Sequence, residues 1–205
     1  MYETVIAYVD GFNLYFGLRA KKWKKYYWLN IFALSQALLK KHQRLHLCHY
    51  FTARIRGVDH QDDAPRRQTV YLDALTTIKG VRVHEGHFLA KKERCRSCHA
   101  EHSRYEEKKT DVHIAVRMVA DAYEKRMDTV LLVSADSDLS PAVEQVRKLN
   151  KKIIVAFPPK RYSDELRRIA HACLHINASL LKKCQLPDIV YTESRHPLKR
   201  PEQWR

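Results

Sequence analysis

Short apolar segments alternate with amphipathic segments along almost the whole chain, and this alternation limits the fold more than any other feature. Continuous apolar runs of strand length occur at 4–9, 128–134 and 152–157. Such runs are typical of parallel strands that are buried on both faces of a sheet. Residues 110–123, in contrast, carry apolar side chains at helical spacing. The alternation predicts a three-layer α/β/α fold, in which helices cover a mainly parallel central sheet.

The same patterns predict the remaining elements and the domain organisation. Further strands are expected at 45–54, 81–88 and 173–176, and further helices at 12–19, 31–41, 65–79, 140–149 and 163–172. We interpret 1–186 as one domain, in which 90–109 forms a charged insertion or loop. Residues 187–205 are rich in proline and polar side chains, which predicts a loosely held polar C-terminal extension.

The charge balance indicates a polyanionic partner. The chain has 38 Lys and Arg against 23 Asp and Glu, a formal net charge of +15. This excess favours nucleic acid, although a basic protein without such a partner has the same composition. No apolar run approaches the ~20 residues of a membrane span, and the N-terminus lacks the features of a signal peptide. Five scattered cysteines fit a reduced, cytoplasmic protein.

Acidic residues follow the predicted strands at the edge where α/β proteins bind ligands. Asp10 directly follows the first strand, Asp136 and Asp138 follow the strand at 128–134, and Asp111 begins a helix. In an open α/β sheet, ligands bind outside the carboxyl ends of the strands. Clustered carboxylates repel one another, and a hard divalent cation such as Mg²⁺ or Mn²⁺ relieves that repulsion. The pattern predicts a metal site formed by these acids.

Each acid also has a local interpretation. Asp10 with Gly11 could form a turn, Asp111 could stabilise a helix N-terminus, and Asp136 with Asp138 could form a turn and a cap. For any one of them alone, the local role is the better interpretation. Their common place at one sheet edge, in a basic chain, favours a functional site.

Three stretches around these acids resemble the NYN domain, a branch of the PIN-like nucleases. They are "YVDGFNLYFGL", "EEKKTDVHIAVRMVADAY" and "DTVLLVSADSDLSPAVEQVRKLNKKIIVAFPP", and the resemblance extends over 3–178. It implies a PIN-like fold and metal-dependent endoribonuclease activity. The chain departs from many relatives at Thr110 and His113, where those relatives have Gly and Asn. On this resemblance the site positions are Asp10, Asn13, Asp111, Ser134, Asp136 and Asp138.

A cysteine pair within 90–109 suggests a second metal. Cys95 and Cys98 form a C-x-x-C pair followed by His99 and His102, which are zinc-ligand types. Four ligands so close in sequence are crowded, so His84 or His87 could complete the site instead. The alternative is a charged loop with two free thiols.

Basic residues beside aromatic ones suggest where nucleic acid binds. Lys24 and Lys25 lie in the stretch "KKWKKYYW", which can contact phosphates and stack on bases, or can cover the core with solvated lysines. Lys160 and Arg161 follow a predicted strand end, and Lys109 precedes Asp111. These five are the candidate RNA contacts.

We therefore expect a metal-dependent endoribonuclease that hydrolyses phosphodiester bonds with a metal-activated water. The expected partner is single-stranded or structured RNA, with no membrane, and a homo-oligomer is compatible with the sequence. The alternative is a non-catalytic RNA-binding or regulatory module that retains the acidic pocket. A phosphatase of the haloacid dehalogenase type fits less well, because Phe12 stands where that mechanism needs a second Asp.

Overall fold

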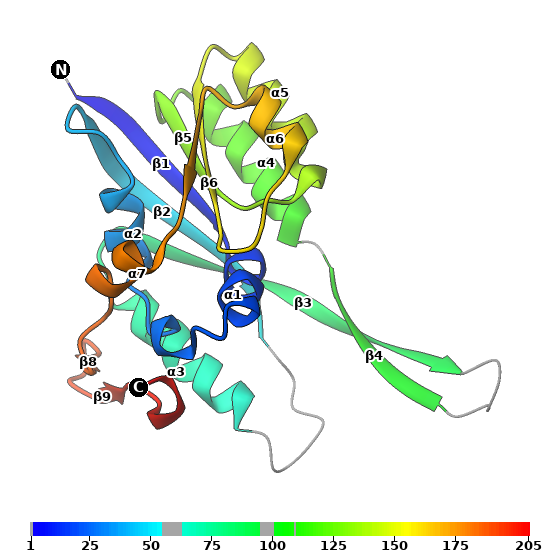
Figure 1. The fold of residues 1–205 in the computed structure, drawn as a ribbon, viewed down its shortest axis with the longest axis vertical. Helices are drawn as coiled ribbons and strands as arrows, with labels where there is room; N and C mark the ends of the chain where they lie inside the picture. Colours follow the sequence, from blue (N-terminus) through cyan, green and yellow to red (C-terminus); the bar gives the residue numbers. More distant parts are fainter. Residues whose placement is uncertain (1, 55–62, 95–100, 109) are drawn as a thin grey trace.

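A seven-stranded sheet forms the centre of the molecule (Figure 1). The computed structural model describes residues 2–54, 63–94, 101–108 and 110–205. The strand order is β4-β3-β2-β1-β5-β6-β7; β3 and β4 pair antiparallel, and the other neighbours among the described strands of this sheet pair parallel. The strands are β1 (Glu3–Asp10), β2 (Gln43–Ala53), β3 (Val81–Arg94), β4 (Glu101–Lys108), β5 (Thr129–Val133), β6 (Lys152–Phe157) and β7 (Ala172–His175).

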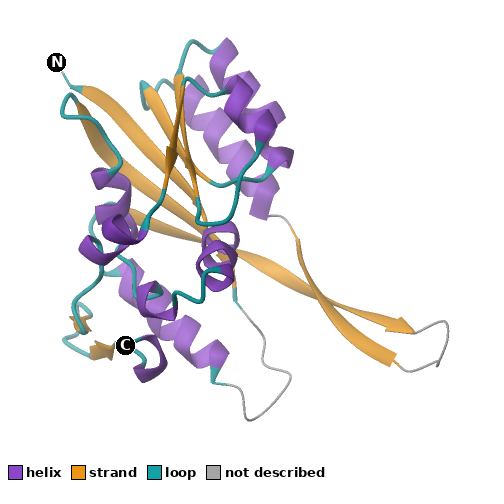
Figure 2. Cartoon of the chain, viewed as in Figure 1, coloured by secondary structure: helices purple, strands orange, loops and turns teal. Residues whose placement is uncertain are grey.

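Helices cover both faces of this sheet (Figure 2). Alternate residues of β1 divide the core: Val5 and Val9 pack on one side, and Ile6 and Tyr8 on the other. The first side carries α1 (Gly11–Ala20), α2 (Ile31–Ala37), α3 (Ala64–Thr76) and α7 (Ala178–Lys183); the second carries α4 (Thr110–Tyr123), α5 (Ser140–Lys148) and α6 (Asp164–Ile169). The predicted three-layer α/β fold is confirmed.

The chain reverses its direction of travel across the sheet beside β1. From β1 it passes outward to β2 and β3, and after β4 and α4 it returns to place β5 on the other side of β1. This reversal is a topological switch point, where ligands of open α/β sheets bind at the carboxyl ends of the strands. The ends of β1 and β5 therefore define the edge where a site is expected.

Helix caps account for two of the predicted starts. The Asn30 side chain accepts a hydrogen bond from the Ala33 N–H at 2.9 Å, and the Ser163 hydroxyl accepts one from the Leu166 N–H at 3.2 Å. Each side chain satisfies a backbone donor that the first turn leaves free. Both helices end earlier than expected. In particular, α6 stops at Ile169 because the following residues turn into β7.

The stretch expected as a charged insertion or loop at 90–109 contains the end of β3 and all of β4. β3 continues to Arg94 and pairs with β4, so that His87 lies opposite Lys108 and Arg94 lies opposite Glu101. The two strands form an antiparallel pair that extends away from the other strands (Figure 1). The many charged residues of this stretch give no apolar alternation in the sequence, so no β pattern was predicted there.

The expected loose C-terminal extension packs against the domain. It contains β8 (Ile189–Tyr191), β9 (Pro197–Lys199) and a 3₁₀ turn, η3 (Glu202–Trp204). The Trp204 ring lies 5.6 Å from that of Tyr27, and Arg200 donates to the backbone carbonyl of Lys25 at 2.5 Å. A few apolar and ring contacts suffice to hold this segment, although its overall composition is polar.

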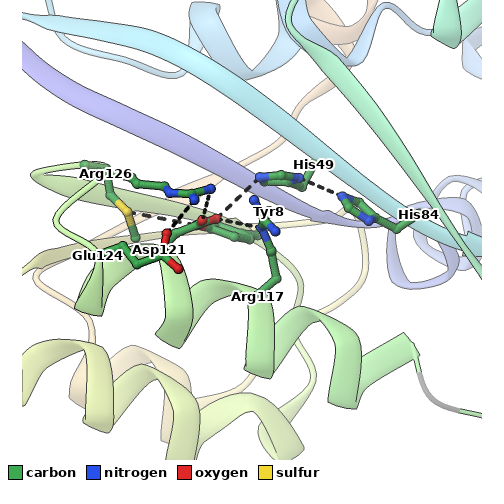
Figure 3. Close-up of polar contacts among 8 residues, drawn as sticks. Tyr8, His49, His84, Arg117, Asp121, Glu124 and Arg126 are labelled. Atoms are coloured by element: carbon green, nitrogen blue, oxygen red, sulfur yellow. Dashed lines mark hydrogen bonds and ion pairs between the residues drawn. The ribbon is translucent and has the colours of Figure 1, made fainter.

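A buried carboxylate on α4 ties that helix to the sheet (Figure 3). Asp121 is 1% exposed and accepts a hydrogen bond from the Tyr8 hydroxyl of β1 at 2.9 Å. Arg117 and Arg126 donate to the same carboxylate at 3.1 and 3.3 Å. The His49 ring of β2 lies 3.5 Å from it. The hydrogen bond from Tyr8 therefore joins the last turns of α4 to β1.

His49 is held neutral within this cluster. Burial lowers its pKa to about 4, and the nearby His84 contributes to the shift. The Nδ1 of His49 lies 2.7 Å from the Nε2 of His84, so one imidazole donates to the other. The network thus extends from α4 across β1 and β2 to β3.

Asp121→Ala should lower the free energy of unfolding by about 2–4 kcal/mol, because it leaves the buried Tyr8 hydroxyl without its acceptor and Arg117 without its counter-charge. Urea denaturation followed by tryptophan fluorescence measures the change. Glu124→Ala is the matched control on the same helix, since Glu124 pairs with Arg126 but is 47% exposed. We expect about 0–1 kcal/mol for it. Equal losses in the two variants would contradict the structural role of Asp121.

Candidate metal centre

The buried carboxylate of Asp10 ends β1 and begins α1. Asp10 is 4% exposed, and its Oδ1 accepts a hydrogen bond from the Asn13 N–H at 2.9 Å. Asp10 therefore caps α1, where the local interpretation predicted a turn with Gly11, and the cap uses only one carboxylate oxygen. The other oxygen faces the neighbouring strand.

The exit of β5 is bonded to this carboxylate. Ser134 is buried, and its hydroxyl donates to Asp10 Oδ2 at 2.9 Å and accepts from the Asp136 N–H at 3.1 Å. The side-chain oxygen of Asn13 accepts from the Ala135 N–H at 3.2 Å. Asn13 and Ser134 thus hold the segments after β1 and β5 together, so both position the acids.

The two acids after β5 occupy different places. Asp136 caps the short 3₁₀ turn η2 (Ser137–Leu139), and its Oδ1 accepts from the Asp138 N–H at 3.0 Å. Asp138 is exposed. Residues 136–138 therefore form a turn and also contribute a carboxylate to the site. The backbone N–H of Asp138 orients the carboxylate of Asp136.

Three of the four predicted acids converge. Asp111, from the first turn of α4, joins Asp10 and Asp136, and one carboxylate oxygen from each lies within 4.8 Å of the others. The three come from separate segments, at the end of β1, at the start of α4 and after β5, which meet at the switch point. Asp138 does not belong to this group, although its charge contributes to raising the pKa of Asp111.

The electrostatics of this group, which we call the acidic triad (Asp10, Asp111 and Asp136), are unfavourable without a cation. Burial raises the pKa of Asp10 to about 6; the hydrogen bonds from Asn13 and Ser134 oppose the rise, and the charges of Asp111 and Asp136 add to it. Burial also raises the pKa of Asp111, as do the charges of Asp136 and Asp138. The triad fits a hard divalent cation, because such ions prefer oxygen ligands and offset this repulsion.

The predicted basic contacts are dispersed around this edge. Lys24 and Lys25 lie in the 3₁₀ turn η1 (Lys24–Tyr26) after α1. Lys160 and Arg161 follow the carboxyl end of β6, and the Arg161 guanidinium stands 6.0 Å from the centroid of the Phe16 ring. Lys109 lies outside the described residues.

The proposed zinc ligands also lie outside what the structure describes. Cys95, Cys98 and His99 fall in an undescribed segment, as do the side chains of His87 and His102. His84, considered as a distal ligand, bonds to His49 instead. Cys48 and Cys184 are buried, as small apolar residues.

The sequence patterns did not single out two features of the helices that border the site, α4 and α1. Asp121, which positions α4, sits at helical spacing among apolar residues and looks like a solvated charge. Tyr15 and Phe16 lie on α1 shortly after Asp10 and are 37% and 40% exposed. The dense run of rings in 12–16 was the available signal for them.

Asp10→Asn should raise the free energy of unfolding of the metal-free protein at pH 8 by on the order of 1 kcal/mol. Asn can still cap α1, but it lacks the charge whose pKa is raised from 3.8 to about 6 on folding. One pKa unit corresponds to about 1.4 kcal/mol, and the lost acceptor offsets part of the gain. Between these two pKa values the folded state binds more protons than the unfolded state, so the cost of the charge grows with pH and is complete above pH 6.

The stabilisation should therefore shrink as pH falls toward 4, and urea denaturation in EDTA across this range measures it. Asp138→Asn is the control, because Asp138 is exposed and outside the triad. We expect a change within about 0.5 kcal/mol for the control. A destabilised Asp10→Asn protein at pH 8 would contradict the repulsion described above.

Comparison with known proteins places the chain in a family. Residues 4–177 match the NYN domain. "6-hydroxy-3-succinoylpyridine 3-monooxygenase HspA" of Pseudomonas putida (strain DSM 28022 / S16) is 27% identical over 235 residues, covering 96% of this chain and 74% of that protein. A solved structure of a protein of unknown function from Vibrio parahaemolyticus has a TM-score of 0.58 at 20% identity, over 90% of this chain and 97% of that one.

The likeness to the solved structure concerns the fold, whereas the family match spans most of the sequence and includes Asp10, Asp111 and Asp136. The resemblance seen in the sequence motifs is therefore confirmed, and the chain belongs to the NYN domain family.

Proposed function

We propose that this protein is a metal-dependent endoribonuclease. The observation that carries the proposal is the convergence of three carboxylates at the switch point of an NYN domain. NYN domains are generally nuclease-like and act on RNA. The chain also carries a net charge of +15, so a negative site lies in a molecule that attracts a polyanion.

The residues of the triad would hold the cation. A bound Mg²⁺ or Mn²⁺ supplies the positive charge that activates water and neutralises the phosphate. Asp10 gives the site its buried wall, and Ser134 and Asn13 keep the segments after β1 and β5 in register. The backbone of Asp138 orients Asp136. Water adds to phosphorus and the 3′-oxygen leaves, so the products carry a 5′-phosphate and a 3′-hydroxyl.

A second candidate function follows from the similarity to a protein named as a monooxygenase of 6-hydroxy-3-succinoylpyridine. Non-haem iron oxygenases commonly bind Fe(II) through two histidines and one carboxylate. Within the described residues, the only group of His, Cys, Asp or Glu side chains close enough to share a metal ion is the acidic triad, which contains no histidine. Oxygen-only ligands suit Mg²⁺ and Mn²⁺, so we favour hydrolysis. Turnover of the pyridine substrate with a reductant and O₂ would support the second candidate.

The helices and the composition bear on the location of the protein. None of the helices in the described part of the chain has the length and apolar content to cross a membrane. We propose a cytoplasmic location from the composition.

An RNA-binding module without activity is the main alternative to an enzyme, and the variants below separate the two.

Asp10→Asn and Asp136→Asn should each abolish cleavage of single-stranded RNA, with a loss of at least about 100-fold in rate, because each removes a charge that binds the cation. Gel electrophoresis of end-labelled RNA measures the rate, and EDTA should stop the wild-type protein. Added Mn²⁺ or Mg²⁺ should restore it. Asp188→Asn, an exposed acid on the C-terminal segment, is the control and should cleave normally.

Persistent cleavage by both variants in EDTA would refute the proposal. So would products with 2′,3′-cyclic phosphates, since those arise from attack by the 2′-hydroxyl of the RNA itself. RNA binding without cleavage by the wild-type protein would favour the non-catalytic alternative.

Charge reversal of Lys24, Lys25, Lys160 and Arg161 to Glu should flatten the dependence of RNA affinity on salt. Each phosphate contact with a single strand contributes about 0.7 to the slope of log affinity against log salt concentration. Fluorescence anisotropy across a salt series measures this slope. The matched control reverses four cations at the opposite edge of the sheet: Lys125, Arg147, Lys148 and Lys151. Equal slopes for the two quadruple variants would place the RNA elsewhere.

A further inference from the structure

A cavity of about 730 Å³ lies on the α1–α3 side of the sheet, next to the acidic triad. It is bounded by α1, η1, α3 and η3, and Figure 1 shows the C-terminal turn lying beside α3. Pockets for small molecules and cofactors commonly have volumes of about 300–1,000 Å³. The cavity therefore has room for a nucleobase with its ribose.

The cavity begins one residue from the triad. Gly11 lines it and directly follows Asp10. A Cβ built on Gly11 would lie 2.7 Å from the Tyr50 hydroxyl oxygen and 2.6 Å from the Phe51 carbonyl, so only glycine fits here. Burial and the charge of Asp10 both raise the pKa of Tyr50, which also lines the cavity. A ligand in the cavity would thus lie close to the buried carboxylate.

The walls are aromatic and their rings form a continuous series. The Tyr15 ring lies 5.4 Å from Phe16 and 5.1 Å from Tyr27, and Tyr27 contacts Trp204 at 5.6 Å. All four line the cavity. Tyr15 and Phe16 are also partly exposed, at 37% and 40%, and both lie on α1, the helix that Asp10 caps.

Cations border these rings. Arg19, Lys24 and Arg67 line the cavity. The Arg161 guanidinium lies 6.0 Å from the centroid of the Phe16 ring. Exposed rings beside several cations suit a flat aromatic ligand that carries negative charge. A nucleotide has this chemistry, because the base stacks on rings and the phosphate contacts arginine or lysine.

We propose that this cavity binds an unpaired nucleobase of the RNA beside the phosphate to be cut, with the base stacked on Tyr15 or Phe16. This inference rests on the proposed function and adds a substrate requirement to it. A base within a duplex is stacked and paired, so it reaches such a cavity only after being turned out. Single-stranded or looped RNA is therefore the substrate, and duplex RNA is not.

The experiment measures binding separately from cleavage. The cleavage-deficient Asp10→Asn protein is titrated, in EDTA, into a short fluorescein-labelled single-stranded RNA, and anisotropy gives the affinity. Tyr15→Ala in this background should weaken binding about 5- to 100-fold, the range expected for losing one stacked base. Tyr123→Ala is the control: Tyr123 ends α4 and is 76% exposed. It should change the affinity less than twofold.

Two additions make the test specific. Tyr15→Leu keeps the apolar contacts of the side chain without the ring, and it should weaken binding in the same direction even if Tyr15→Ala unfolds. An RNA series with one abasic nucleotide at successive positions should contain one member for which Tyr15→Ala has no further effect. That member identifies the base that occupies the cavity.

Equal affinities for the Tyr15 variants and the Tyr123 control would overturn the inference, whether or not the wild-type protein cleaves RNA. If nicotinate bound in the cavity and the RNA affinity did not depend on Tyr15, the cavity would be a site for a small aromatic acid. That result would also overturn the inference. Dependence of binding on Tyr15 without any cleavage by the wild type would support the inference while refuting the nuclease proposal.

Discussion

The buried carboxylate of Asp10 is bonded to both segments that leave the centre of the sheet. It caps α1 through Asn13 and receives the hydroxyl of Ser134 from the end of β5. It also lies beside two other carboxylates, which help to raise its pKa to about 6. Burying a charge among like charges is unfavourable, and the hydrogen bonds from Asn13 and Ser134 offset part of that cost.

The arrangement of the other acids depends on elements far from the site. β1 and β5 become neighbours only because the chain returns across the sheet after the β3–β4 hairpin and α4. Asp111 reaches the site from the first turn of α4, and Asp121, three turns later, accepts a hydrogen bond from Tyr8 of β1. A buried polar contact and a carboxylate of the acidic triad thus share one helix.

The sequence allowed the fold class and the main acids to be predicted because both follow from local rules. Apolar runs identify buried strands, and Asp10 and Asp136 follow two of them directly. Asp136 lies nearer than Asp138 to the end of β5, so the sequence favoured it as the more direct ligand. The sequence also counted Asp138 as a ligand, but the short turn after β5 leaves Asp138 outside the triad. The packed C-terminal segment was missed because Trp204 binds to rings that are distant in sequence, and no local pattern shows that contact.

The central claim is that Asp10, Asp111 and Asp136 hold a divalent cation. Diffraction from crystals of this protein soaked in Mn²⁺, with anomalous differences collected at the manganese edge, tests it most directly. We expect a strong anomalous peak among the three carboxylates, within about 2.0–2.3 Å of their oxygens. The peak should be absent from Asp10→Asn crystals soaked in the same way. An empty triad in the wild-type protein, with Mn²⁺ bound elsewhere or nowhere, would contradict the claim.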